Sequence, residues 1–230
     1  MEYIEGMFAV HASYRGRSRR RADYVRDVAS ALEQSSMVDA IYAKGVEDFV
    51  CVTTGPEDTG GLVLSLLQAG DFAISIGAVV GAEQLILDDD ASDEATEESA
   101  EEAELRRETI AAAQRAMKPA AKAGSVAVRV EKAGPGGVLA PGRAADIAED
   151  ITSAFTLLAH VLGRRTKEGR EATALLRAGH LQSEAAQIVG ISKQAMSQRL
   201  HAAGWHAEQA GWSLAVHMLA RVDELAATGY

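Results

Sequence analysis

Between residues 192 and 204 the chain carries polar and basic side chains at helical spacing and neither Asp nor Glu. Such side chains can recognise base edges, since Gln pairs with adenine, Lys binds guanine or phosphate, and Ser contacts bases or phosphate. The residues that we expect to contact bases are Lys193, Gln194, Ser197 and Gln198. The absence of carboxylates matters because an acidic group would repel the phosphate backbone. This surface is therefore suited to lie against duplex DNA.

The elements that must position these side chains are two short helices, predicted over residues 182–189 and 193–203. Gly190 allows the chain to reverse between them, because glycine accepts a left-handed conformation without steric cost. Ser192 is a good N-cap for the second helix, since its hydroxyl can accept a hydrogen bond from a free backbone N–H. The pattern is typical of a helix-turn-helix, which places its second helix in the major groove. The alternative interpretation is an ordinary helical hairpin in a core.

Further side chains in and near this segment are suited to bind DNA phosphates rather than bases. A long amphipathic helix predicted over residues 144–162 ends in positive charge, and a supporting helix is predicted over residues 173–178. The expected phosphate contacts are Arg164, Arg165, Lys167, Ser192, Arg199 and His201. One helix-turn-helix covers few base pairs, so useful affinity argues for a homodimer on a two-fold site.

The net charge of −10 is unusual for a DNA-binding protein, but it is concentrated in one place. Residues 83–108 contain twelve acids and two arginines, which carry −10 together, so the rest of the chain is neutral. Residues 83–104 are predicted to be an acidic insertion, either a mobile loop or a solvated helix start. The alternatives are a surface that docks on a basic partner, as in an adaptor or a DNA mimic, and a metal site. Consecutive aspartates converge on one ion only in an ordered loop.

Composition excludes several classes of protein. No apolar run is long enough to span a bilayer, and the N-terminus lacks a signal-peptide pattern, so a cytoplasmic bacterial protein without membrane contact is expected. Cys51 is the only cysteine and lies between valines, which predicts a buried strand residue and excludes a disulfide framework. The six histidines show no metal-ligand spacing. We therefore expect neither a metal nor another cofactor.

The residues before the helix-turn-helix predict an α+β domain. Hydrophobic periodicity over residues 7–131 gives the order strand, helix, strand, strand, helix, strand, helix, strand, with the helices expected at residues 18–34, 62–69 and 105–123. This order predicts a split βαβ sheet with helices on one face, a ferredoxin-like or palm-type sandwich. The nine residues 134–142 include two prolines and four glycines and predict a domain boundary. We expect an α+β sensor or dimerisation domain at residues 1–133 and an all-α domain at residues 142–230.

A dense basic stretch follows the first predicted strand. It consists of Arg15, Arg17, Arg19, Arg20 and Arg21. Three interpretations stay open: the arginines clamp DNA phosphates beside the helix-turn-helix, hold the phosphates of a small ligand, or form a solvated turn.

Three sequence segments at the junctions between these predicted elements resemble those of known families. They are Phe72-Ala-Ile-Ser-Ile-Gly77, Val52-Thr-Thr-Gly-Pro-Glu-Asp58 and the basic residues 163–170 ahead of the helix-turn-helix. They resemble the class III nucleotidyl cyclase and GGDEF-type palm fold, and the SatD-like family, which attaches a helix-turn-helix to such a domain. The resemblance implies a palm-type domain that binds a nucleotide. A cyclase of that fold holds two metal ions with aspartates from the first strand and from the hairpin.

The chain departs from that pattern where catalysis would need it. The first strand runs through His11 to Ser13 without a carboxylate at its end, and Pro56 stands where the family would have Asp. Glu57 and Asp58 are left one position off and could equally stabilise the start of the following helix. We therefore expect no enzymatic activity from this domain.

Together these features predict a sequence-specific DNA-binding protein, a transcriptional regulator that reads the major groove with the helix at residues 193–203. The expected partners are double-stranded DNA and a second copy of the chain, with a small nucleotide as a candidate effector. The alternative is a nucleotide-binding sensor or enzyme on a degenerate cyclase-like palm domain.

Overall fold

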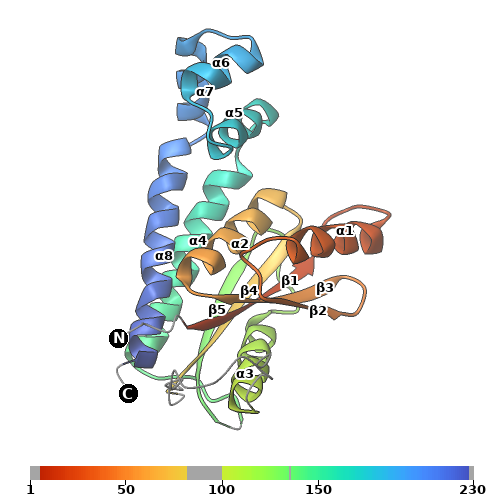
Figure 1. The fold of residues 1–230 in the computed structure, drawn as a ribbon, viewed down its shortest axis with the longest axis vertical. Helices are drawn as coiled ribbons and strands as arrows, with labels where there is room; N and C mark the ends of the chain where they lie inside the picture. Colours follow the sequence, from red (N-terminus) through yellow and green to blue (C-terminus); the bar gives the residue numbers. More distant parts are fainter. Residues whose placement is uncertain (1–5, 82–99, 135, 228–230) are drawn as a thin grey trace, which may run out of the picture.

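The computed structural model describes residues 6–81, 100–134 and 136–227, and these form a mixed five-stranded sheet and eight helices (Figure 1). The predicted α+β class is confirmed. The strands are β1 (Met7–Tyr14), β2 (Ala40–Lys44), β3 (Asp48–Thr54), β4 (Phe72–Val80) and β5 (Val126–Lys132). Most of the predicted acidic insertion at residues 83–104 lies outside the described residues.

The sheet has the strand order β2-β3-β1-β4-β5. Neighbouring strands are antiparallel, except that β4 and β5 run parallel. Helix α1 (Arg21–Glu33) connects β1 to β2, and helix α2 (Pro56–Ala69) connects β3 to β4. Because β3 lies between β1 and β2, the predicted split βαβ arrangement is confirmed.

Helices cover both faces of this sheet, so the prediction of helices on one face is wrong. Helices α1 and α2 lie on one side, and α3 (Ala100–Ala116) lies on the other (Figure 1). Alternate residues of β1 follow this division: Phe8 and Val10 belong to the main core, whereas Ala9 packs with Ala113 of α3. The physical reason is β4, which is buried at every position and therefore needs cover on both faces.

The long helices α4 (Arg143–Gly163) and α8 (Trp205–Ala227) pack against each other and against the sheet. Ile151 and Phe155 of α4 and Leu219 of α8 share one buried core with β1 and β4. The core therefore does not divide at residues 134–142, where the sequence predicted a boundary between two domains. Backbone hydrogen bonds hold this segment against β5. One of them runs from the Ala140 N–H to the Val130 carbonyl at 3.0 Å.

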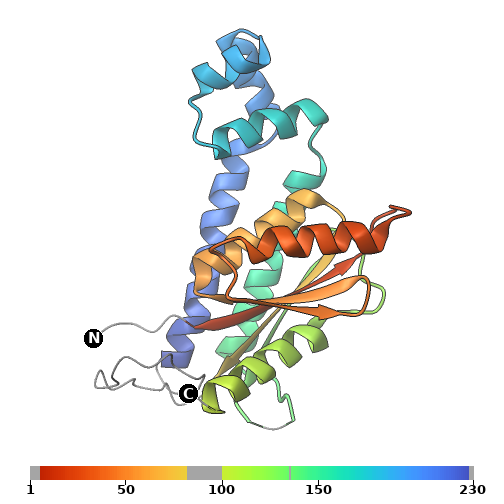
Figure 2. The ribbon, with the colours of Figure 1, turned by 45° about the vertical axis from the view of Figure 1, so that its right-hand side comes forward.

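Three short helices form a second, smaller core at the end of the α4–α8 pair that lies away from the sheet (Figures 1 and 2). They are α5 (Lys167–Arg177), α6 (Gln182–Val189) and α7 (Lys193–Ala202). The α4–α8 pair thus carries a separate helical unit, which we call the α5–α7 unit. Among the described residues, no helix combines the length and apolar character needed to cross a bilayer.

Candidate nucleic-acid interface

The turn between α6 and α7 is built by local hydrogen bonds. Gly190 has φ 75° and ψ 33°, the left-handed conformation expected of it. The backbone N–H of Ile191 donates to the Ala186 carbonyl at 3.0 Å and closes α6. The Ser192 hydroxyl accepts from the Ala195 N–H at 3.1 Å, as predicted for the N-cap of α7. The chain therefore reverses within three residues.

One face of α7 packs inward. Met196 and Leu200 are buried and contact Ala185 and Ala186 of α6 within the smaller core. The two alanines are almost fully buried, so their small side chains let α6 lie close to α7. Because one face is fixed in this core, the opposite face of α7 has a defined orientation.

The exposed surface of α7 includes all four predicted base-contacting side chains. Lys193, Gln194, Ser197 and Gln198 are exposed, and His201 continues the same side of the helix. In Figure 1 α6 and α7 lie at the end of the molecule farthest from the sheet. The described part of the chain leaves this face uncovered and accessible to a large partner.

The predicted phosphate contacts are placed less uniformly. Arg164 and Lys167 are exposed, and Arg199 is half-buried. Ser192 is exposed, but its hydroxyl already accepts the capping hydrogen bond of α7. Arg164 lies within 3.5 Å of a His160 ring nitrogen one turn earlier in α4.

The prediction that Arg165 binds phosphate is wrong. Arg165 is buried, its guanidinium is ion-paired with Glu208 of α8, and its Nε–H donates to the Ala203 carbonyl at 2.7 Å. Arg177 of α5 contacts the same carboxylate, with its Nε 2.9 Å from Oε1 of Glu208. The sequence offered no local indication of this buried group, because Glu208 belongs to the following helix.

Positive charge concentrates on this part of the chain. Residues 164–204 contain seven Lys or Arg and three Asp or Glu, which gives a local charge of +4 in a chain of −10. One acid, Glu168, lies among the cations. Its pKa is lowered first because its carboxylate accepts from its own backbone N–H, then by Thr166, and less by Arg199 and Lys167. Lys and Arg thus remain in excess over the three acids of this stretch, Glu168, Glu171 and Glu184.

The arginines after β1 lie elsewhere. Arg15 is half-buried and donates to the Ala121 carbonyl at 3.2 Å, while Arg20 and Arg21 form ion pairs with Asp23 and Glu47 at 3.0 and 2.8 Å. The other two, Arg17 and Arg19, are exposed and make no ion pair within the described residues. In both views the loop between β1 and α1 lies beside the sheet, apart from the α5–α7 unit (Figures 1 and 2). The two basic regions therefore do not form one surface.

The carboxylates suggested by the palm-fold resemblance do not lie near these arginines. Glu57 and Asp58 occupy the first turn of α2, directly after β3. Thr54 pairs with Met7, so this turn lies at the start of β1, whereas the arginines follow its end. An eight-residue strand, about 25 Å long, separates the two groups. They cannot contact the phosphates of one nucleotide together.

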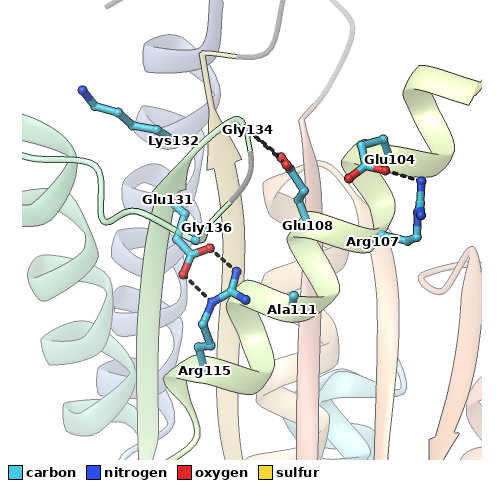
Figure 3. A pocket seen from close by; sticks show the side chains of 10 residues that line it. Glu104, Arg107, Glu108, Ala111, Arg115, Glu131, Lys132, Gly134 and Gly136 are labelled. Atoms are coloured by element: carbon cyan, nitrogen blue, oxygen red, sulfur yellow. Dashed lines mark hydrogen bonds and ion pairs between the residues drawn. The ribbon is translucent and has the colours of Figure 1, made fainter.

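A pocket of about 380 Å³ lies between α3 and the loop that follows β5 (Figure 3). Burial alone would raise the pKa of Glu131 at its edge, but hydrogen bonds from Arg115 and Arg129 outweigh this effect and lower that pKa. Glu108 accepts a hydrogen bond from the Gly134 N–H at 3.1 Å, and Glu104 forms an ion pair with Arg107 (Figure 3). Each acidic side chain that lines the pocket therefore has a partner. None of the residues predicted to bind DNA or a ligand lines this pocket, although Glu104 ends the predicted acidic insertion and three of the lining glycines belong to the predicted boundary at residues 134–142.

His11 of β1 is a buried polar side chain that the sequence left unassigned. It is 7 % exposed, and neither ring nitrogen has a hydrogen-bond partner in the described structure. Burial lowers its pKa from 6.5, assisted by Arg15 and Lys44 and opposed by Asp48. The imidazole is therefore held in its neutral form within the fold.

We expect stability to fall as the pH drops below about 6.5, because the unfolded chain then binds a proton that folded His11 resists. The stability that comes from keeping His11 neutral is fully present above pH 6.5. It is lost as the pH falls from 6.5 to the lower pKa of His11 in the folded state. Urea midpoints at pH 7.5 and 5.5 should differ less in His11→Gln than in the wild type, whereas the exposed His217→Gln should behave like the wild type. Equal pH dependence in all three proteins would contradict this assignment.

Comparison with family models, with curated proteins and with solved structures found no match for this chain. The resemblance to the SatD-like family therefore stays a prediction. Among the described residues, no group of three or more His, Cys, Asp or Glu side chains is placed to hold a metal ion. The site must be interpreted from its own geometry.

Proposed function

We propose that the chain is a sequence-specific DNA-binding protein that acts as a transcriptional regulator. In this proposal α6 and α7 form a helix-turn-helix, and α7 enters the major groove. The observation that carries the proposal is the exposure of Lys193, Gln194 and Ser197 on α7, while Met196 and Leu200 of the same helix are held in a core.

The dimensions of α7 support this proposal. An α-helix with its side chains is about 10–12 Å across and fits the major groove, which is about 12 Å wide. The ten residues of α7 extend about 15 Å along the helix axis. In helix-turn-helix proteins the N-terminal residues of the second helix contact base edges. Lys193, Gln194 and Ser197 are the first, second and fifth residues of α7, which contains no acid in its first turn. These positions support the assignment of the three side chains as base contacts.

The charge distribution supports a single orientation on DNA. Residues 164–204 carry +4, whereas the other described residues together carry −4. A duplex attracts the basic end and repels the acidic body, and this field orients the protein during encounter. The exposed Arg164 and Lys167, together with Arg199, are the proposed phosphate contacts at this end.

We assign a regulatory rather than a catalytic role to the sheet and its helices. The separation of Glu57 and Asp58 from the basic stretch after β1 favours this role over nucleotide turnover. A small nucleotide that modulates DNA binding and a cytoplasmic location are parts of the same proposal. The proposed complex contains two copies of the chain on a two-fold DNA site.

Gln194→Ala is expected to weaken binding to a specific duplex by about 1–3 kcal/mol and to change binding to unrelated duplexes little, because Gln194 is assigned to a base edge. The duplex is first selected from a random pool with the wild-type protein, and affinities are then measured by fluorescence anisotropy. Gln34→Ala is a matched control, since Gln34 is exposed at the end of α1.

Two results would count against this proposal. Equal losses on specific and unrelated duplexes would show that Gln194 does not read bases. Failure of the wild-type protein to bind any duplex at low ionic strength, where phosphate contacts are strongest, would refute DNA binding altogether.

A further inference from the structure

The α4–α8 pair has an outward side whose residues are fixed by two contacts. The helices run antiparallel from the sheet to the α5–α7 unit (Figures 1 and 2). Near the sheet, Asp150 of α4 lies 3.9 Å from the Arg221 guanidinium of α8. Near the α5–α7 unit, a Cβ added at Gly204 would lie 2.9 Å from a methyl group of Val161. These contacts align the two helices along their length.

Helical spacing then places two large apolar side chains together. Leu157 lies seven residues after Asp150 on α4, and Leu214 lies seven residues before Arg221 on α8. Each leucine therefore lies on the same face of its helix as the charged residue of the ion pair. Leu157 is 65 % exposed and Leu214 is 44 % exposed. Both therefore point outward on the same side of the pair, at a similar height.

The surroundings of these leucines contain no formal charge. Residues 151–163 of α4 and 209–220 of α8 include no Asp, Glu, Lys or Arg, although 24 % of the chain is charged and about six such residues would be expected. We call the outward side of these two segments the uncharged strip. Its exposed residues are Ser153, Thr156, Leu157, His160, Gln209, Ala210, Ser213, Leu214 and His217. Depletion of charge is the compositional mark of the centre of a protein interface.

We propose that the uncharged strip is the surface on which a second copy of this chain docks, with the two-fold axis along the α4–α8 pair. Under such an axis the strip covers itself, because both copies present the same patch. Asp150 of one copy then lies at the level of Arg221 of the other, so the charged border of the strip is also self-complementary. A nucleic acid or a charged protein would find no partner charge on the strip.

The size of the strip sets the expected strength of the dimer. Twelve or thirteen helical residues extend about 18–20 Å, and two adjacent helices are about 20 Å wide. Such a contact buries on the order of 1,000 Å² in total, which is the lower end for specific interfaces. We therefore expect a reversible dimer whose population rises with concentration, rather than an obligate one.

This inference extends the proposed function by naming the surface that joins the two copies. The strip borders the α5–α7 unit, so an axis along the helices brings both copies of α7 to the same end. Two helices at one end are what a two-fold DNA site requires.

Sedimentation equilibrium without DNA tests the inference. The wild type should change from monomer to dimer between low micromolar and submillimolar concentrations, and Leu157→Lys should weaken the dimer at least about tenfold. Val138→Lys is the control, because Val138 is 58 % exposed but lies on the loop after β5. A second measurement uses Leu157→Cys, since the only native cysteine, Cys51, is fully buried. Mild oxidation should link Leu157→Cys into a covalent dimer and leave Val138→Cys monomeric.

Each outcome decides the inference separately from the proposed function. A monomeric wild type at all concentrations, or a dimer that Leu157→Lys and Val138→Lys leave equally intact, would overturn the strip as a self-interface. A dimer that binds no duplex would keep the strip and remove the proposed function. A monomer that still binds a duplex would support DNA binding and overturn the strip as a self-interface.

Discussion

Glu208→Gln is expected to reduce the free energy of unfolding of the α5–α7 unit by about 3–5 kcal/mol, although the two side chains have nearly the same shape. The Glu208 side chain is 0 % exposed and pairs with Arg165, whose side chain is 2 % exposed. Arg177 approaches the same carboxylate at 2.9 Å. Loss of the carboxylate charge leaves the buried Arg165 guanidinium, which has little access to water, and the partly exposed Arg177 beside a neutral amide. Buried ionic groups lose most when one partner alone is removed.

Two further variants separate this cause from a general effect of substitution. Glu171→Gln changes an exposed acid of α5 and should alter stability by no more than about 0.5 kcal/mol. The triple variant Arg165→Met, Arg177→Met, Glu208→Leu replaces the whole ionic group with apolar side chains and should retain most of the stability. Urea unfolding followed by tryptophan fluorescence measures all three, because Trp205 packs in the smaller core and lies beside Arg177. A loss below about 1 kcal/mol in Glu208→Gln would show that these charges do not hold α5 to α8.

The buried ionic group of Arg165, Arg177 and Glu208 also helps to fix the orientation of α7. Glu208 lies in the first turn of α8, while Arg165 lies in the link between α4 and α5 and Arg177 is the last residue of α5. Because α5 packs on α6 and α7, the ionic group fixes the α5–α7 unit relative to the helix that carries it. A residue far from the proposed DNA surface thereby controls the direction in which that surface points.

Local sequence patterns predicted the helices and strands better than they predicted how these elements pack against each other. Each strand can be recognised from its own apolar segment, so these segments predicted the order of strands and helices along the chain. Which faces the helices cover depends on distant packing. The continuous run of apolar and small residues in β4 contained the needed information, because a strand buried on both faces lacks polar alternation. The prediction of helices on one face overlooked it.

Helix limits were displaced where a turn or a proline intervenes. The helix expected from residue 18 begins at Arg21, because the Ser18 N–H instead donates to the Tyr14 hydroxyl at 2.9 Å. The helix expected to run to residue 123 ends at Ala116, ahead of Pro119, which has no N–H to continue it. The helix expected from residue 62 begins at Pro56, since proline fits the first helical position.

The candidate interface shows the same division between local and distant causes. Gly190 and Ser192 have the predicted conformations because turn and cap hydrogen bonds involve residues within a few positions. The burial of Arg165 could not be predicted, because its partner Glu208 belongs to a helix beyond the whole helix-turn-helix segment. In sequence alone, an arginine that pairs with a buried carboxylate looks the same as one that contacts phosphate.

Gly77→Ala is the second substitution for which we expect a large effect, a loss of about 3 kcal/mol or more in the free energy of unfolding. A Cβ at Gly77 of β4 would lie 2.6 Å from the Thr109 carbonyl oxygen, and closer still to the Ala113 nitrogen, both in the backbone of α3. Backbone atoms cannot rotate away as a flexible side chain can. The Ser75 hydroxyl donates to the Ala113 carbonyl at 2.7 Å and holds α3 at this short distance. The methyl group therefore forces α3 away from the sheet.

Gly163→Ala provides the matched control, because a Cβ there would meet nothing within 4 Å and the backbone is not left-handed. It should leave stability unchanged or raise it slightly, since alanine favours the helix that Gly163 ends. Urea unfolding followed by far-UV circular dichroism measures both variants, and equal midpoints would refute the close packing of α3. The smaller core contains no residue of α3. Gly77→Ala should therefore keep the duplex affinity of the wild type under native conditions while it weakens the sheet, which separates the stability of the fold from the proposed recognition surface.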